Sequence, residues 1–294
     1  MKNLFALVLL FMLGLSFAVP EMVNVSTYVI NAGKFDQQTG GYTVDFYLWM
    51  VCADNCSSNF EFTNGRAVSI DKITNEPNEK FYRIQAALQD PVDFREYPFD
   101  SHKLTIGIED KTLTTGQLIY VPDLNASGIE SSIQFPGWKV KGWNATSINH
   151  AYKQYNEVFS EYEFSILLER EAISALLKIF VPVLFIMLLN FFAHFPDPDK
   201  ITTRITLHSS FLIAAVMFHV AIGNQLPPLG YLTVADKFMF ASYLSLGFSL
   251  FSAIVILELT EEKNTALVGK VHHYSGIASF LLWISSLVIV MLTI

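Results

Sequence analysis

One stretch of the sequence places side chains that could handle hydrated ions along a single helical face. Steps of three and four residues through a long apolar segment give a stripe that is polar, then apolar, then polar again. Its members are Thr203, Thr206, Ser210, Ile213, Met217, Val220 and Asn224. A helix that lines a water-filled path across a membrane would carry such hydroxyls. Ile213, Met217 and Val220 would then form a hydrophobic gate that closes by dewetting.

The polar residues of this segment also allow a purely structural role. Thr and Ser hydroxyls in membrane helices often bond to their own backbone or to a neighbouring helix. His208 and His219 are eleven residues apart, so they share one helical face away from the stripe. Ionisable residues in membrane spans are candidates for function, and histidine can sense protons. The alternative is a neutral imidazole bonded to backbone.

The remaining reactive residue types point to no enzyme. The only cysteines, Cys52 and Cys56, could form a disulfide across a tight loop or stay as buried thiols. No Cys or His group has metal-ligand spacing, so we expect no metal site. The nucleophile-elbow, phosphate-loop and zinc-protease motifs are absent from the sequence, and we expect neither catalysis nor a cofactor.

Four apolar stretches can position the stripe in a membrane. They cover 172–193, 201–222, 234–257 and 271–294, with short connections between them. Each is long enough to cross about 30 Å of hydrocarbon, and helices satisfy the backbone there. Residues 1–18 resemble a signal peptide rather than a further span. We therefore expect a multi-pass protein of the cell membrane, with the N-terminal half and the C-terminus extracellular or periplasmic.

The exported half, residues 19–170, is expected to be a β domain. Runs rich in β-branched and aromatic residues predict strands, with Gly, Pro, Asn and Asp between them. The runs cover 23–30, 42–49, 81–88, 104–108, 117–121, 137–143 and 163–168. Such spacing favours an antiparallel β-sandwich. The expected fold is thus an extracellular antiparallel β-sandwich followed by a four-helix transmembrane bundle over 171–294.

Composition agrees with this division. The chain is 52% hydrophobic and only 16% charged, against about 25% charged residues in a soluble domain. Its net charge of −8 argues against a nucleic-acid partner. Residues 19–170 hold 20 Asp and Glu against 12 Lys and Arg, so the exported half carries this acidity.

The segment Asp90–Leu104 resembles the signature loop of pentameric ligand-gated ion channels, the Cys-loop receptor family. The residues Tyr97-Pro98-Phe99-Asp100 match its aromatic-Pro-hydrophobic-Asp core. Asp90 and Leu104 stand where animal members have bridged cysteines, and prokaryotic members lack that bridge. Arg170, Pro182 and the loop 224–236 follow in the order of the family. The resemblance covers nearly the whole mature chain.

This resemblance implies a ligand-gated channel, most simply a homopentamer, with the second span of each subunit around a central pore. Its partners would be permeating ions, membrane lipid and a small-molecule agonist or protons. Residues expected to couple the domains are Asp36, Tyr97, Pro98, Phe99, Asp100, Arg170, Pro227 and Pro228. Arg170 would pair with Asp100 or Asp36, or act only as an interfacial anchor. Candidate ligand contacts are Tyr82, Glu109, Tyr152, Tyr155 and Phe159, whose aromatics could instead fill the sandwich core.

Further residues bear on which ion a channel would conduct, and on whether the protein is a channel, a sensor or a transporter. Asp197 and Asp199 near the inner mouth favour cations, although the stripe starts without the Glu found in many cation-selective members. A non-conducting β-sandwich sensor or adhesion protein on a membrane anchor would have no reason to carry the stripe. A transporter would usually show inverted repeats, which the four spans lack.

Overall fold

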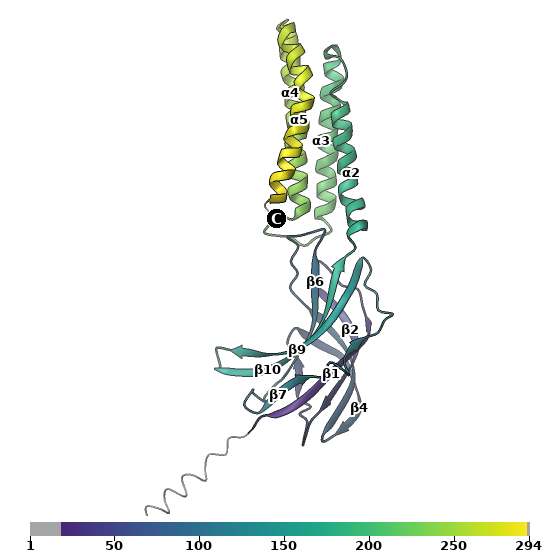
Figure 1. Cartoon of the computed structure of the whole chain (residues 1–294), viewed down its shortest axis with the longest axis vertical. Helices are drawn as coiled ribbons and strands as arrows, with labels where there is room; N and C mark the ends of the chain where they lie inside the picture. Colours follow the sequence, from purple (N-terminus) through teal and green to yellow (C-terminus); the bar gives the residue numbers. More distant parts are fainter. Residues whose placement is uncertain (1–18, 293–294) are drawn as a thin grey trace, which may run out of the picture.

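The computed structural model describes residues 19–292, so the predicted signal peptide lies outside the described residues. The molecule is elongated, with a β-sandwich at one end and a bundle of four long helices at the other (Figure 1). The predicted β domain and the predicted helical bundle therefore follow each other along the long axis of the molecule.

Two sheets form the sandwich. The larger has the order β4-β5-β2-β1-β7, with β8 also on β1, and the smaller has the order β3-β6-β10-β9. The strands are β1 (Glu21–Ala32), β2 (Gly41–Val51), β3 (Phe60–Phe62), β4 (Gly65–Glu76), β5 (Glu79–Gln89), β6 (Ser101–Asp110), β7 (Leu118–Pro122), β8 (Gly128–Ile129), β9 (Trp138–Tyr152) and β10 (Glu157–Arg170). Most pairs are antiparallel, but β7 and β8 run parallel to β1. The expected β-sandwich is confirmed, and β7 and β8 join β1 in parallel because the chain crosses from β6 in the smaller sheet to the larger sheet before it forms them.

Alternation of apolar residues builds the core. In β2 every second side chain from Tyr42 to Met50 is buried, and β5 alternates in the same way from Tyr82 to Leu88. These faces meet buried residues of β6 and β10 between the sheets. The sequence missed β3, β4 and the two-residue β8. Strand β4 fully buries none of its residues, so it lacks the contrast between core and solvent positions.

A disulfide closes the turn after β2. Cys52 and Cys56 are bonded to each other, and their Cα atoms lie 5.4 Å apart. Both side chains are buried against the sandwich core. The bond therefore fixes the path of the chain from the larger sheet toward β3 in the smaller one.

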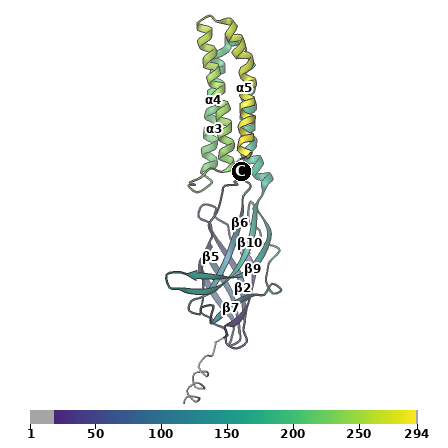
Figure 2. The ribbon, with the colours of Figure 1, turned by 60° about the vertical axis from the view of Figure 1, so that its left-hand side comes forward.

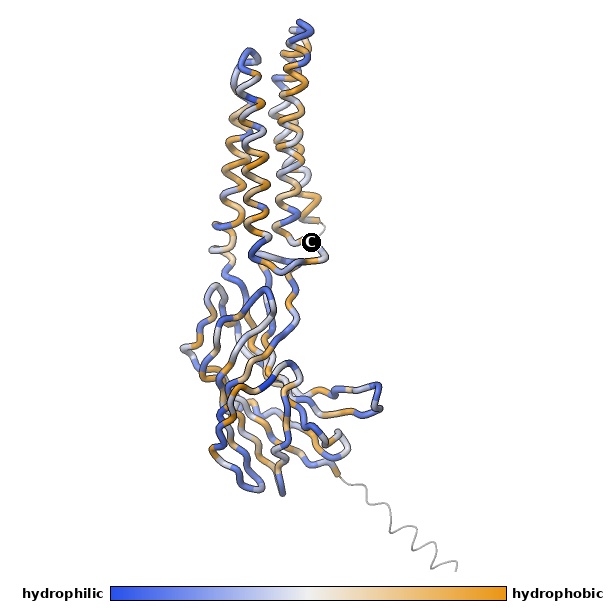
Figure 3. The backbone as a smooth tube through the Cα atoms, turned by 180° about the vertical axis from the view of Figure 1, so that it is seen from behind, coloured by the Kyte–Doolittle hydropathy of each residue, from blue (hydrophilic) through white to orange (hydrophobic). Residues whose placement is uncertain are grey.

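Four helices follow β10, and each is long and apolar enough to cross a membrane. They are α2 (Ala172–Phe192), α3 (Ile201–Gly223), α4 (Val234–Glu261) and α5 (Thr265–Leu292), with a 3₁₀ turn η1 (Pro198–Lys200) before α3. Apolar residues dominate their length, whereas polar residues mark both ends of the bundle (Figure 3). The loop expected over 258–270 is shorter, because α4 and α5 continue as polar helical turns beyond the apolar run.

The junction between the two parts is formed by loops and helix ends. Strand β10 leads into α2 after a single residue, and the loop before β6 reaches the same level (Figure 2). Helix α5 ends on the sandwich side of the bundle (Figures 1 and 2). The N-terminal domain and the end of α5 therefore lie on one side of any membrane that the bundle crosses.

Candidate functional site

The predicted stripe occupies the uncovered face of α3. All seven of its residues are exposed in this chain, and Ile213 and Met217 are each 64% exposed. The opposite face of α3 buries Arg204, His208 and Ala215 inside the bundle. The structure therefore brings the predicted pore-lining residues together on the one face of α3 that the other three helices leave free.

Two of the stripe hydroxyls bond to their own helix. Thr206 Oγ1 donates to the carbonyl of Thr202 at 2.9 Å, and Ser210 Oγ donates to the carbonyl of Thr206 at 2.8 Å. This is the alternative that the sequence left open. It does not exclude contact with ions, because each hydroxyl gives its proton to the backbone and keeps oxygen lone pairs that a cation can use.

His208 and His219 both bond to side chains rather than to backbone. His208 is fully buried, and its Nδ1 lies 2.7 Å from Asn190 Oδ1 on α2. His219 lies nearer the junction, with Nε2 2.8 Å from Asp236 Oδ1 and Nδ1 3.0 Å from the Tyr243 hydroxyl, both on α4. Each histidine therefore links α3 to a neighbouring helix of the same subunit.

A buried arginine holds the other end of the bundle. Arg204 of α3 donates to His272 Nδ1 at 2.9 Å and to Ser275 Oγ at 2.8 Å, both on α5, and to His194 Nδ1, which follows α2. Its Nε has no hydrogen-bond partner among the described residues. Sequence reasoning missed this cluster because its members come from three separate stretches, and only their packing brings them together.

Arg170 forms the central contact of the domain junction. Its Nε and Nη2 donate to the two carboxylate oxygens of Asp100 at 2.6 and 2.8 Å, and Nη2 also reaches Gln37 Oε1 at 3.2 Å. The guanidinium lies 4.2 Å from the centre of the Trp138 ring and 5.0 Å from that of Tyr97. Of the two expected partners, the structure selects Asp100, whereas Asp36 bonds to Gln38 and Thr39 in its own turn.

The carboxyl group of Asp100 is almost completely buried, with 1% of its side chain exposed. Burial alone would raise its pKa. The hydrogen bonds from Arg170, and the contact with His102 Nε2 at 2.7 Å, outweigh burial and hold the pKa of Asp100 below its usual range. Asp100 is therefore a carboxylate that depends on its partners for its charge.

The loop that contains Tyr97, Pro98 and Phe99 docks onto the helices. The carbonyls of Arg95 and Tyr97 accept hydrogen bonds from the first two amides of α4, Val234 and Ala235, both at 3.1 Å. These amides have no partner within their own helix. The Phe99 ring stacks on Phe180 of α2 at 5.8 Å. The loop is therefore in direct contact with both α2 and α4.

The other expected coupling residues flank this contact. Residues 36–40 form an exposed turn between β1 and β2, and a cavity of about 400 Å³ is lined by Asp36, Gln37, Arg170 and Gln225. Gln225 begins the α3–α4 loop, in which Pro227 is half-buried and Pro228 exposed. The turn and the α3–α4 loop therefore face each other across the junction.

The candidate ligand contacts are divided by the fold. Tyr82 lies inside the sandwich core, 1% exposed, so the core interpretation holds for it. Phe159 is buried, packing edge-on against Tyr152. Tyr155 is 75% exposed in the β9–β10 turn. The Tyr152 hydroxyl donates to Glu109 Oε1 at 2.5 Å, so these two residues form one unit.

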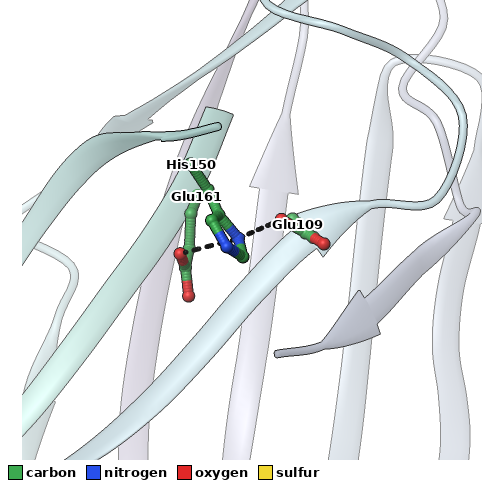
Figure 4. Close-up of side chains that lie close together, drawn as sticks. All are labelled: Glu109, His150 and Glu161. Atoms are coloured by element: carbon green, nitrogen blue, oxygen red, sulfur yellow. Dashed lines mark hydrogen bonds and ion pairs between the residues drawn. The ribbon is translucent and has the colours of Figure 1, made fainter. Parts of the chain in front are cut away.

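Glu109 also belongs to a group that the sequence did not reveal. His150 of β9 and Glu161 of β10 lie beside it, with one ligand atom of each residue within 4.8 Å of the others (Figure 4). The expectation of no metal-ligand group rested on spacing along the chain. These residues come from three strands, and only the strand register brings them together.

Comparison with known proteins finds similarity to ion channels and receptor subunits. No family model matches the sequence. The proton-gated ion channel of Gloeobacter violaceus is 25% identical over 218 residues, which is 73% of this chain and 60% of that protein. Neuronal acetylcholine receptor subunit alpha-10 of Rattus norvegicus is 24% identical over 57% of this chain and 37% of its own length. A pH-sensitive chloride channel 2 of Drosophila melanogaster is 23% identical over 52% of this chain and 31% of its own length.

The chain is similar to channels and receptor subunits of the pentameric ligand-gated ion channel family. It is a membrane protein, and its relatives are channels and receptor subunits rather than enzymes. The match spans about three fifths of the Gloeobacter protein and less of the others.

In this chain, hydrogen bonds close the signature loop at the positions that resemble the bridged cysteines. Asp90 Oδ2 accepts from the amide of Thr105, beside Leu104, at 2.5 Å and from the Tyr42 hydroxyl at 2.9 Å. Asn64 Nδ2 donates to Asp90 Oδ1 at 3.0 Å. Asp90 therefore ties the start of the loop to its end.

Proposed function

We propose that this chain is a subunit of a pentameric ligand-gated ion channel, most simply a homopentamer, in which five α3 helices surround a central pore. The relatives' names and the family signature support this function. The observation that carries it is the free face of α3. That face holds Thr203, Thr206 and Ser210 at one end and Asn224 at the other.

A ring of subunits explains the polarity of this face. Helices α2, α4 and α5 cover the opposite face of α3, so only another subunit or water can meet the hydroxyls of the free face without lipid contact. Polar groups that face hydrocarbon are costly, whereas a water-filled pore solvates them. Ile213, Met217 and Val220 are the large apolar residues of the face and form the gate in this proposal.

We propose that the pore conducts cations. Asp197 and Asp199 are exposed at the end of the bundle farthest from the sandwich, beside the start of α3. Carboxylates there would raise the local cation concentration at the inner mouth. One relative is named a chloride channel, so selectivity needs measurement. Reversal potentials in asymmetric KCl should follow potassium, and a reversal that follows chloride would contradict this part.

The stimulus is proposed to be protons or a small-molecule agonist. Two relatives are named for proton gating or pH sensitivity. Protonation of His219 would strengthen its contact with Asp236 at the first turn of α4, beside the junction. Replacing both His208 and His219 by Gln should change the pH response of the current, and an unchanged response would contradict their role as proton sensors.

The junction residues are proposed to carry the stimulus to the pore. Movement of the sandwich would act through Arg170 and Asp100 on the Tyr97–Asp100 loop. That loop holds the start of α4 and stacks on α2. Asp36, Pro227 and Pro228 flank the same contact. Coupling then means that a ligand favours one of two arrangements of these parts.

The decisive test is ion flux through purified protein in liposomes, over a range of pH and with a panel of amines. Ile213→Ser should raise resting flux, because a hydroxyl removes the dewetted barrier. Ile277→Ser is the matched control, since Ile277 is 53% exposed and as far from the start of α5 as Ile213 is from the start of α3. Equal flux from both variants would contradict the pore assignment, and no flux under any condition would favour a non-conducting sensor.

A further inference from the structure

A group of three potential metal ligands lies in the sandwich, far from α3. His150 Nδ1 is 3.0 Å from Glu109 Oε2 and 3.5 Å from Glu161 Oε2, and the imidazole lies between the two carboxylates (Figure 4). The carboxylates are buried, with 4% and 10% of their side chains exposed, whereas the imidazole is 37% exposed. The group is thus a protected carboxylate pair with one open side.

The strand register forces the two carboxylates together. Glu109 of β6 and Glu161 of β10 are direct cross-strand partners, an arrangement that is unfavourable for like charges. Among the described residues, His150 is the only basic side chain paired with either of them. Burial also raises the pKa of Glu161. The fold therefore maintains a concentration of negative charge that a bound cation would relieve.

Hydroxyl donors orient both carboxylates toward one point. The Tyr152 hydroxyl donates to Glu109 Oε1, and Thr63 Oγ1 donates to Glu161 Oε1, each at 2.5 Å. The second oxygen of each carboxylate, Oε2, is the one that faces His150 Nδ1. Partners of this kind are what fixes ligand carboxylates in metal sites.

The backbone makes room for this arrangement at Gly107. A Cβ there would lie 2.2 Å from Thr63 Oγ1 and 2.7 Å from Glu161 Oε1. Any side chain at this position would therefore push apart the hydroxyl and the carboxylate that it orients. The glycine is needed for the packing of the pair rather than for an unusual backbone conformation, since it lies within regular β6.

We propose that Glu109, His150 and Glu161 form a binding site for a divalent transition metal ion of the zinc class. One imidazole nitrogen and two carboxylate oxygens suit such an ion, whereas calcium and magnesium prefer oxygen alone. Tetrahedral bonds of about 2.0–2.2 Å put neighbouring ligand atoms about 3.3–3.6 Å apart. The imidazole nitrogen already lies 3.0 and 3.5 Å from the two carboxylate oxygens, and the three ligand atoms lie within 4.8 Å of one another, so a bound ion would draw the two carboxylates closer together.

The ion takes the place of the proton on His150 Nδ1. A single N–H can point at only one carboxylate at a time, whereas a metal ion binds both and the nitrogen together. Water reaches the site on the exposed side of His150 and supplies the remaining ligand. Bound metal ties the β9–β10 hairpin to β6. The metal site can be tested independently of the proposed pore, because metal binding can be measured without any current.

The test uses full-length protein in detergent, dialysed first against a chelator. Titration calorimetry with Zn²⁺ should give one site per chain, and Co²⁺ should give the visible absorption bands of a tetrahedral centre. His150→Gln and Glu161→Gln should each weaken Zn²⁺ binding by at least tenfold. Thr63→Val keeps all three ligands and should weaken it about tenfold through lost orientation.

His273→Gln is the matched control, because His273 is an exposed histidine outside the group. It should leave the affinity unchanged. Absence of a Zn²⁺ site in the parent protein would overturn the proposal, as would equal binding by His150→Gln. Ca²⁺ binding as tight as Zn²⁺ binding, unaffected by His150→Gln, would also overturn it in favour of a carboxylate site. A channel that fails to conduct but still binds Zn²⁺ at these residues would refute only the pore function.

Discussion

Removal of Arg170 tests whether the junction depends on one ion pair. Arg170→Gln leaves Asp100 buried, with His102 as its remaining side-chain hydrogen-bond partner. Breaking a buried pair from one side costs about 3–5 kcal/mol, and the contact with His102 places the expectation at about 3. For a domain of this size, that loss lowers Tm by about 6–12 °C.

The assay is thermal unfolding followed by tryptophan fluorescence. Trp138, one of four tryptophans, lies under the Arg170 guanidinium at 4.2 Å, so part of the emission comes from this contact. Asp100→Asn together with Arg170→Gln should cost less than the sum of the two single changes, with an interaction energy of about 1.5–3 kcal/mol. Additive effects would refute the idea that Arg170 acts on stability through Asp100.

A surface pair provides the control. Arg83 pairs with Asp45 at 2.7 Å, but its side chain is 48% exposed. Exposed pairs contribute about 0.2–1 kcal/mol, so Arg83→Gln should barely move Tm. Equal losses for Arg83→Gln and Arg170→Gln would show that burial of the junction pair adds nothing, which contradicts the reasoning from the structure.

The Arg170–Asp100 pair also predicts how the stability of the protein changes with pH. Because the pKa of Asp100 is lower in the folded protein than in the unfolded chain, its stabilisation is complete above the unfolded value, about 3.9. It is lost as the pH falls from there through the folded pKa. The difference in Tm between the parent and Asp100→Asn should therefore shrink below about pH 4, and a gap that grows there would contradict the assignment.

Three further changes test other parts of the fold by the same unfolding assay. Asp90→Ala should cost about 3 kcal/mol, because it leaves three partly buried donors without their acceptor; a loss within error would mean that Asp90 does not hold the signature loop closed. Phe94→Ala should cost about 3–5 kcal/mol, since the ring is fully buried at the junction, whereas Val68→Ala on exposed β4 should change little. Reduction of the Cys52–Cys56 bond should cost about 2 kcal/mol by the loop-closure model, and an unchanged Tm in reductant would contradict this.

The sequence determined those features that depend on local pattern. Long apolar runs predict membrane helices because each must satisfy its own backbone in lipid, and four such helices are present. Strong alternation predicts strands such as β2 and β5, which have one buried face. The stripe on α3 was visible because a helix repeats at fixed spacing, although the sequence could not say that the other helices leave this face free.

Tertiary structure decided every feature that depends on which distant residues meet. Packing chose Asp100 over Asp36 as the partner of Arg170, and it surrounded Arg204 with His194 and His272. The register of three strands made one group of Glu109, His150 and Glu161. Such contacts follow from the relative placement of whole elements, which local spacing does not encode.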